Sequence, residues 1–199
     1  AFARGGGMDR KYQTLEGVMD EVYRIAQETF PRQLEVHLKS EKDPWVVYAN
    51  ANEIQQVVLN LAVNARDCLE DAGGGTIRMS IESRTGDARE ASGVAGLSEG
   101  DYALLRVVDD GPGMEKRVLD RTFDPFYTTK EEGKGTGLGL SSSLGIVEAH
   151  HGCVHVNSTV GEGTCFRIYL PAHPDRAPEG DTEDRAYLRG EGQGNLVVD

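Results

Sequence analysis

The stretch Gly133-Lys134-Gly135-Thr136-Gly137-Leu138-Gly139-Leu140-Ser141 runs from a glycine-rich loop directly into a helix predicted at about 138–151. Glycines at the start of a helix leave backbone amides free, and the helix dipole adds positive potential there. A flexible hinge is the alternative, but a hinge would not need Thr136, Leu138 and Leu140 at alternate positions. The stretch therefore predicts a phosphate-binding loop at a helix N-terminus.

A second glycine cluster, Asp109-Asp110-Gly111-Pro112-Gly113-Met114, directly follows an apolar strand predicted at 102–108. A carboxylate at a strand end, followed by two glycines, lets a ligand approach the backbone closely. Asp109 can accept a hydrogen bond from the amino group of adenine, whereas guanine has a carbonyl at that place and would leave the carboxylate unpaired. The cluster favours an adenine nucleotide, with a simple Asp-Gly turn as the alternative.

The clearest helix is predicted at about 52–69, where the polar face carries Asn60-Leu61-Ala62-Val63-Asn64-Ala65-Arg66-Asp67. Asn60 and Asn64 lie one turn apart on this face. An amide oxygen is a suitable ligand for Mg²⁺, which binds through few protein groups together with phosphates. The helix therefore offers a metal ligand, with a solvated helix face as the alternative. The opposite stripe is apolar and comprises Ile54, Val57, Val58, Leu61, Ala65 and Leu69.

The order of the predicted elements is typical of an α+β fold, with helices layered on a mixed β-sheet. Helical periodicity appears at 15–26, 52–69 and 138–151, and strand-like alternation or apolar runs appear at 34–39, 45–48, 76–83, 102–108, 154–158 and 164–170. These elements span one domain of ordinary size.

Taken together and in this order, the motifs resemble one superfamily, the ATPases that unite DNA gyrase, the MutL mismatch-repair proteins and the histidine kinases. The helix at 52–69 resembles the N box, the Asp109–Met114 cluster the G1 box, and the stretch 133–141 the G2 box. Gly161-Glu162-Gly163-Thr164 resembles the final glycine box. Within the superfamily, Phe123-Asp124-Pro125-Phe126-Tyr127-Thr128-Thr129-Lys130 is similar to the F box of sensor histidine kinases, in the lid between G1 and G2.

The resemblance covers roughly 15–171 and implies a Bergerat-type two-layer sandwich, in which three helices cover one face of a mixed sheet beside a mobile ATP lid. It implies that Asn64 binds Mg²⁺ and that Asp109 reads adenine, and we expect Asn60, or a nearby polar group, to orient the attacking imidazole. Phe123 and Phe126 are expected to anchor the lid. The implied ATP-binding residues are Asn64, Asp67, Asp109, Gly111, Gly113, Met114, Phe123, Lys130, Gly135, Thr136, Gly137, Leu138, Gly139, Leu140 and Thr164.

The sequence departs from the family pattern after the N-box Asn. Many histidine kinases place Lys and Tyr three and four positions after Asn64, whereas this chain has Asp67 and Cys68. The departure removes one phosphate contact and leaves the role of Asp67 open. The three cysteines lack metal-ligand spacing, so we expect them to be reduced residues of the core.

The ends of the chain indicate neighbouring domains. No histidine lies in the long dimerising helix that a phosphoacceptor requires, so we expect the acceptor in a preceding domain that ends within residues 1–13. Residues 14–172 then form the ATP-binding catalytic domain. Residues 173–199 read as an acidic linker that leads into a candidate receiver domain of a hybrid or nitrogen-regulatory-type kinase.

Composition narrows the function classes further. The formal net charge of −12 argues against a nucleic-acid partner, which would want a basic face. No apolar run of about 18 residues and no signal peptide are present, so we expect a cytoplasmic location, although the parent protein could be anchored through another part. The expected partners are the kinase's own phosphoacceptor domain and a response regulator or fused receiver domain. The isolated domain is expected to be a monomer.

The sequence thus predicts a protein-histidine kinase module that binds ATP and Mg²⁺. Two alternatives stay open. One is an ATPase-driven clamp of the gyrase or MutL kind, although those enzymes place a general-base Glu where this chain has Asn60. The other is an anti-sigma switch protein that phosphorylates Ser, against which the Phe123–Lys130 segment counts.

Overall fold

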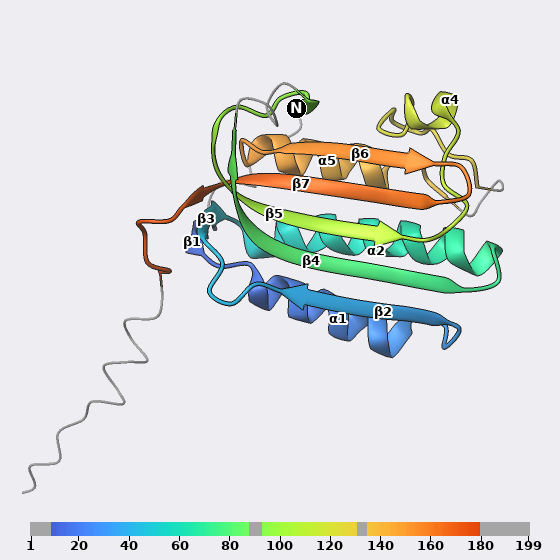
Figure 1. The fold of residues 1–199 in the computed structure, drawn as a ribbon, viewed down its shortest axis with the longest axis horizontal. Coiled ribbons are helices and arrows are strands. Elements are labelled where there is room, and N and C mark those ends of the chain that lie inside the picture. Colours follow the sequence, from blue (N-terminus) through green and yellow to red (C-terminus); the bar gives the residue numbers. More distant parts are fainter. Residues whose placement is uncertain (1–8, 88–92, 131–134, 180–199) are drawn as a thin grey trace, which may run out of the picture.

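The computed structural model describes residues 9–87, 93–130 and 135–179 (Figure 1). Its elements follow the chain in the order β1 (Lys11–Gln13), α1 (Glu16–Thr29), β2 (Leu34–Ser40), β3 (Val46–Ala49), α2 (Ala51–Asp71), β4 (Gly75–Gly86), β5 (Gly100–Asp109), α4 (Lys116–Leu119), α5 (Gly139–Ala149), β6 (Cys153–Thr159) and β7 (Gly163–His173). The predicted helices and strands are all present, and their ends agree within a few residues.

The strands form one mixed sheet. Its order is β1-β3-β7-β5-β4-β2. Strand β6 also pairs with β7, along residues 163–169, whereas β3 pairs with β7 at residues 172–173. The β2–β4 pair is parallel, and the other pairs are antiparallel. The long antiparallel β4–β5–β7 ladder carries the C-terminal end of β5 and the start of β7 to the same edge, because Asp109 pairs with Thr164.

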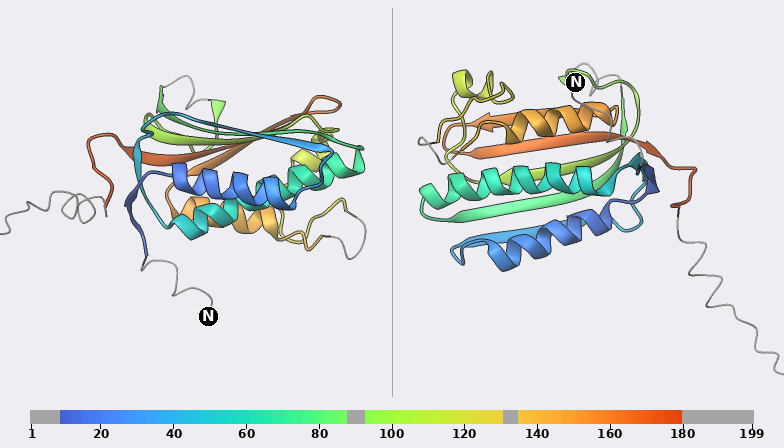
Figure 2. Two further views of the ribbon diagram at one scale, coloured as in Figure 1. Left: turned by 90° about the horizontal axis from the view of Figure 1, so that it is seen from below. Right: turned by 180° about the vertical axis from the view of Figure 1, so that it is seen from behind.

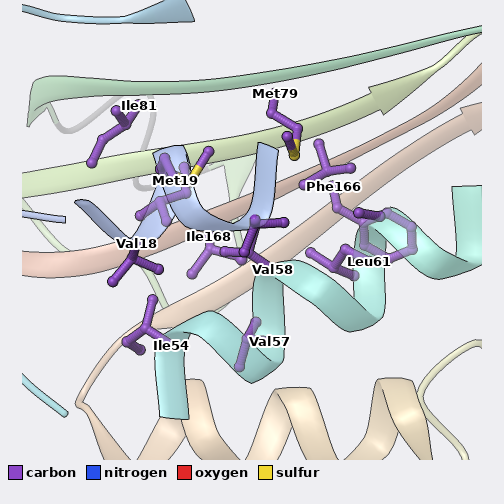
Figure 3. Close-up of a cluster of buried hydrophobic side chains, with 14 of the residues drawn as sticks. Val18, Met19, Ile54, Val57, Val58, Leu61, Met79, Ile81, Phe166 and Ile168 are labelled. Carbon is purple, nitrogen blue, oxygen red and sulfur yellow. The ribbon is translucent and has the colours of Figure 1, made fainter. Parts of the chain in front are cut away.

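Helices α1, α2 and α5 all lie on one face of the sheet (Figure 2). Their apolar stripes and the inward side chains of the strands form the core, in which Leu61 of α2 and Phe166 of β7 face each other (Figure 3). Each large side chain buried there contributes about 1.5–3 kcal/mol. The predicted α+β sandwich, with three helices on one face of a mixed sheet, is confirmed.

Three local features differ from the sequence prediction. The sheet begins with the unpredicted strand β1 at Lys11, which pairs with β3 and places Tyr12 against Tyr48, with ring centroids 5.0 Å apart. The short helix α4 has no clear periodicity and was not predicted. Cys68 is exposed rather than in the core, because Ala65 and Leu69 occupy the buried face of α2 at this turn.

A buried histidine joins the C-terminal end of α5 to the start of α2. His150 Nε2 lies 3.1 Å from the backbone nitrogen of Asn50, the N-cap of α2, and Nδ1 lies 2.8 Å from the carbonyl oxygen of Ile146. Because Asn50 N–H can only donate, Nε2 must accept and the proton must reside on Nδ1. Burial lowers the pKa of His150, with the positive charge of Arg10 acting in the same direction.

We therefore expect stability to fall on acidification through His150. Its folded pKa lies below the ordinary value of about 6.5, so the unfolded chain takes up the proton first as pH falls. The stability is fully present above the unfolded pKa and is lost below it, by at most about 1.4 kcal/mol per pH unit for one group. Urea unfolding between pH 8 and pH 5 measures this slope, which His150→Gln should reduce.

The matched control is His37→Gln, which removes an exposed imidazole on β2. This variant should keep the wild-type slope. Equal slopes in wild type and His150→Gln would contradict the assignment of the pH dependence to His150.

Candidate functional site

The predicted site residues gather at the end of the sheet where strand β5 ends and strand β7 begins. This end also receives the turn between β6 and β7 and the segment that carries α4 (Figure 1). The C-terminal half of α2 and the start of α5 lie below it, on the helical face. Residues of α2, β5, α5 and β7, which are separated in the sequence, thus come together at this end of the sheet.

Asp109 is buried at the end of β5. Its side chain accepts a hydrogen bond through Oδ1 from the backbone N–H of Gly111 at 3.0 Å, and the residue is only 7% exposed. Burial raises the pKa of this carboxyl, although hydrogen bonds from the backbone of Gly111 and Thr164 act against the rise. The backbone of Gly111 therefore fixes Oδ1 and with it the orientation of the carboxylate.

The turn after Asp109 is packed directly on the turn between β6 and β7. Gly113 has a φ of +68°, and a Cβ there would collide with the carbonyl oxygen of Thr159. Gly163 has a φ of +101°, and its Cβ would collide with the carbonyl oxygen of Asp109. Gly161 N–H donates to the Pro112 carbonyl at 2.8 Å. Glycine is required at 113 and 163 by both backbone angle and space.

Ser158 is a site residue that the sequence analysis did not select. Its Oγ accepts from the backbone N–H of Met114 at 2.8 Å and lies 2.9 Å from Thr164 Oγ1. The hydroxyl therefore ties Met114 and Thr164 together. Ser158 could have been predicted from its position opposite Thr164 on the neighbouring strand. That position is known only once the register of β6 and β7 is known.

The polar face of α2 splits into two parts. Asn60 turns toward α5, where Nδ2 lies 3.4 Å from the Gly139 carbonyl and 3.3 Å from Ser143 Oγ. These contacts make Asn60 a residue that positions the start of α5. Asn64 faces a different neighbour, because its Oδ1 accepts from Lys130 Nζ at 3.3 Å.

Lys130 also forms an ion pair with Asp67, one turn further along α2. The second carboxylate oxygen of Asp67 accepts from Arg66, at 2.9 Å from Nε and 2.6 Å from Nη2. Burial alone would raise the pKa of Asp67, but the hydrogen bonds from Lys130 and Arg66 outweigh it and hold the pKa below its usual value.

The described part of the glycine-rich stretch 133–141 lies against the segment Phe123–Lys130, which we call the lid segment. Gly137 has a φ of +65°, and its carbonyl accepts from the backbone N–H of Phe126 at 2.9 Å. Thr136 Oγ1 lies 3.4 Å from the N–H of Leu138, the residue before α5, and Leu140 packs on the core. A Cβ at Gly135 would lie 2.9 Å from Thr128 Oγ1. Gly133 and Lys134 lie outside the described residues.

The expectation that both phenylalanines anchor the lid segment is half right. Phe123 packs on the core and meets Phe166 edge-on, with ring centroids 6.4 Å apart. Phe126 is 74% exposed and has a φ of +65°. Its backbone is held by Gly137, so the aromatic ring points away from the core, and only Phe123 serves as the anchor.

The residues present fit a magnesium ion that is held mainly by a nucleotide. The described residues contain no group of three or more His, Cys, Asp or Glu side chains that could hold a metal by themselves. Asn64 Oδ1 accepts a hydrogen bond from the ammonium group of Lys130, so this oxygen already contacts a positive charge and points where a metal cation could bind. A single amide ligand is what Mg²⁺ needs when phosphates and water complete its shell.

Comparison with known proteins places this geometry in context. The family model for histidine kinase-, DNA gyrase B- and HSP90-like ATPases matches residues 49–174. The sensor kinase CckA of Brucella abortus is 37% identical over all of this chain, which spans 21% of that protein. The sensory histidine kinase/phosphatase NtrB of Rhizobium leguminosarum bv. phaseoli is 35% identical over 83% of this chain, which corresponds to 42% of NtrB.

A solved structure shows the same architecture. The nucleotide-free catalytic domain of the histidine kinase ThkA superposes with a TM-score of 0.65 at 25% identity, over 84% of this chain and 99% of that domain. The chain spans less than half the length of the two curated relatives it matches here. None of the described helices combines the length and apolar character needed to cross a membrane.

Proposed function

The chain belongs to the family of histidine kinase-, DNA gyrase B- and HSP90-like ATPases, and from this premise we propose that it is the ATP-binding catalytic domain of a sensor histidine kinase. The observation that carries the proposal is at Asn60. Position 60 of α2 holds an amide, which donates to Gly139 and Ser143 and positions α5, so this position has no carboxylate that could activate water. The proposal is therefore phosphoryl transfer rather than hydrolysis by a clamp ATPase.

In this proposal, adenine is recognised at Asp109. The carboxylate oxygen that does not contact Gly111 accepts from the adenine amino group. The tight contact between the Gly111–Gly113 turn and the β6–β7 turn keeps the carboxylate in place before the nucleotide arrives. Such preorganisation lowers the cost of ordering the site on binding.

The triphosphate is proposed to lie between the start of α5 and the polar face of α2. The backbone amides at the N-terminus of α5 attract its negative charge, and Lys130 supplies a cation from the lid segment. Asn64 would hold Mg²⁺, which neutralises phosphate charge when it is bound. The γ-phosphoryl group passes from the bridging oxygen of ATP to a ring nitrogen of the acceptor His, and ADP leaves.

The partners of the whole protein are proposed from the same reading. The acceptor His would belong to a neighbouring dimerisation domain, and a response regulator or fused receiver domain would take the phosphoryl group from it. CckA is named a sensor kinase and NtrB a sensory histidine kinase/phosphatase, and these names support the histidine kinase activity from which the partners are proposed. A cytoplasmic location and a monomeric isolated domain are part of the same proposal.

Calorimetric titration of the chain with a non-hydrolysable ATP analogue tests the proposal. We expect saturable binding that is lost in EDTA and is at least about 100-fold weaker for the matching GTP analogue, because guanine leaves Asp109 unpaired. Equal affinity for both analogues would contradict adenine recognition by Asp109. In the longer protein, radiolabelled phosphate should appear on His, and its release as free phosphate instead would favour the clamp ATPase.

A further inference from the structure

The lysine proposed to contact the phosphates already has an anionic partner in the structure. Lys130 Nζ contacts the carboxylate of Asp67 and lies 3.3 Å from Asn64 Oδ1. Asp67 is held from its own helix, because Arg66 donates to its second oxygen and lies with its guanidinium 5.3 Å from the centroid of the Phe30 ring. The carboxylate is thus fixed on α2, while Lys130 comes from a separate segment.

This ion pair is shielded from solvent. The side chains of Lys130 and Asp67 are only 27% and 23% exposed, so the pair is stronger than a typical exposed one, which contributes little. Asp67 also adds a negative charge close to where Asn64 would meet the nucleotide. A triphosphate that enters the site must therefore compete with Asp67 for Lys130.

We infer that Asp67 holds Lys130 in the nucleotide-free protein and releases it to the phosphates when ATP binds. This inference rests on the proposed function and assigns Asp67 a role in it, as a residue that acts through Lys130. The ion pair is then a competitor of the nucleotide. Because the ion pair must break before Lys130 can contact the phosphates, its presence lowers the affinity for ATP. The pair also keeps the lid segment tied to α2 when no nucleotide is present.

The test is a double-mutant cycle on the dissociation constant of the Mg²⁺-bound ATP analogue. Asp67→Asn should bind about 5–30-fold more tightly than wild type, the factor that corresponds to an ion pair of 1–2 kcal/mol. Lys130→Met should bind more weakly, because it loses the cation. In the Lys130→Met background, Asp67→Asn should change affinity by less than about threefold, since no lysine is left to release. Asp67→Ser provides a second variant with the same expectation.

Glu70→Gln is the matched control. Glu70 lies one turn further along α2 and contacts Arg66 at 3.7 Å, so its substitution removes one negative charge from the same helix without touching Lys130. We expect less than about a twofold change in affinity. An equal gain in Glu70→Gln and Asp67→Asn would point to bulk charge and would overturn the inference.

The possible failures are distinguishable. A wild-type chain that does not bind the analogue overturns the proposed function and this inference with it. Wild-type binding with unchanged or weaker affinity in Asp67→Asn overturns the inference alone. A gain that persists undiminished in the Lys130→Met background also overturns it, because Asp67 would then act without Lys130.

Discussion

Gly163→Ala is expected to destabilise the fold by more than about 3 kcal/mol and to abolish nucleotide binding. Residue 163 has a φ of +101°, which costs an L side chain about 1–2 kcal/mol, and its new Cβ would collide with the carbonyl oxygen of Asp109. Relief would require β5 and β7 to separate where Asp109 pairs with Thr164. Thermal unfolding and titration with the ATP analogue measure both effects.

Gly161→Ala in the same turn is the matched control. Gly161 has a φ of +83°, so it carries a similar backbone strain, but a Cβ there has nothing within 4 Å. We expect a loss of only about 1–2 kcal/mol from the backbone angle, with nucleotide binding retained. If both variants lose the same stability, the collision with Asp109 is not the cause, and the close packing of the two turns does not hold the site together.

The sequence predicts well the helices, strands and glycine turns that surround this site, because each of them has a local sequence pattern. The apolar period of α2 follows from burial on one helix face, and the alternation along the strands follows from burial on one face of a sheet. Glycines that follow a strand or precede a helix indicate close backbone approach, which the structure has at Gly113 and Gly137. These signals are readable without knowledge of what packs against them.

The contacts between segments carry no such signal. The ion pair between Asp67 and Lys130 joins residues 63 positions apart, and either residue alone is typical of a solvated surface. The sequence likewise makes Phe126 look like a second anchor, yet the hydrogen bond from its N–H to Gly137 fixes the backbone so that the ring is exposed. Tertiary packing decides both, and a single sequence does not record it.

Asp109→Asn is expected to weaken binding of the ATP analogue by at least about 100-fold while leaving the fold intact. Gly111 N–H occupies one oxygen of Asp109, so the amide of the substituted side chain must keep its oxygen on that side. Its NH₂ group then faces the adenine amino group, donor against donor. The opposite orientation would leave the buried N–H of Gly111 facing a donor, which costs about 1–3 kcal/mol. Titration with the analogue measures the loss, and unfolding confirms that the variant is folded.

The adjacent carboxylate provides the control. Asp110 is exposed, and its Oδ1 accepts from Thr76 N–H at 2.7 Å, a hydrogen bond that an asparagine side chain can also accept. Asp110→Asn removes one negative charge beside the site and should change affinity by less than about threefold. Guanine has a carbonyl where adenine has its amino group. The NH₂ group that Asp109→Asn introduces could donate to this carbonyl, so the variant should also have a smaller preference for ATP over GTP. An unchanged preference would mean that the base is read by another group, and the assignment of adenine recognition to Asp109 would be wrong.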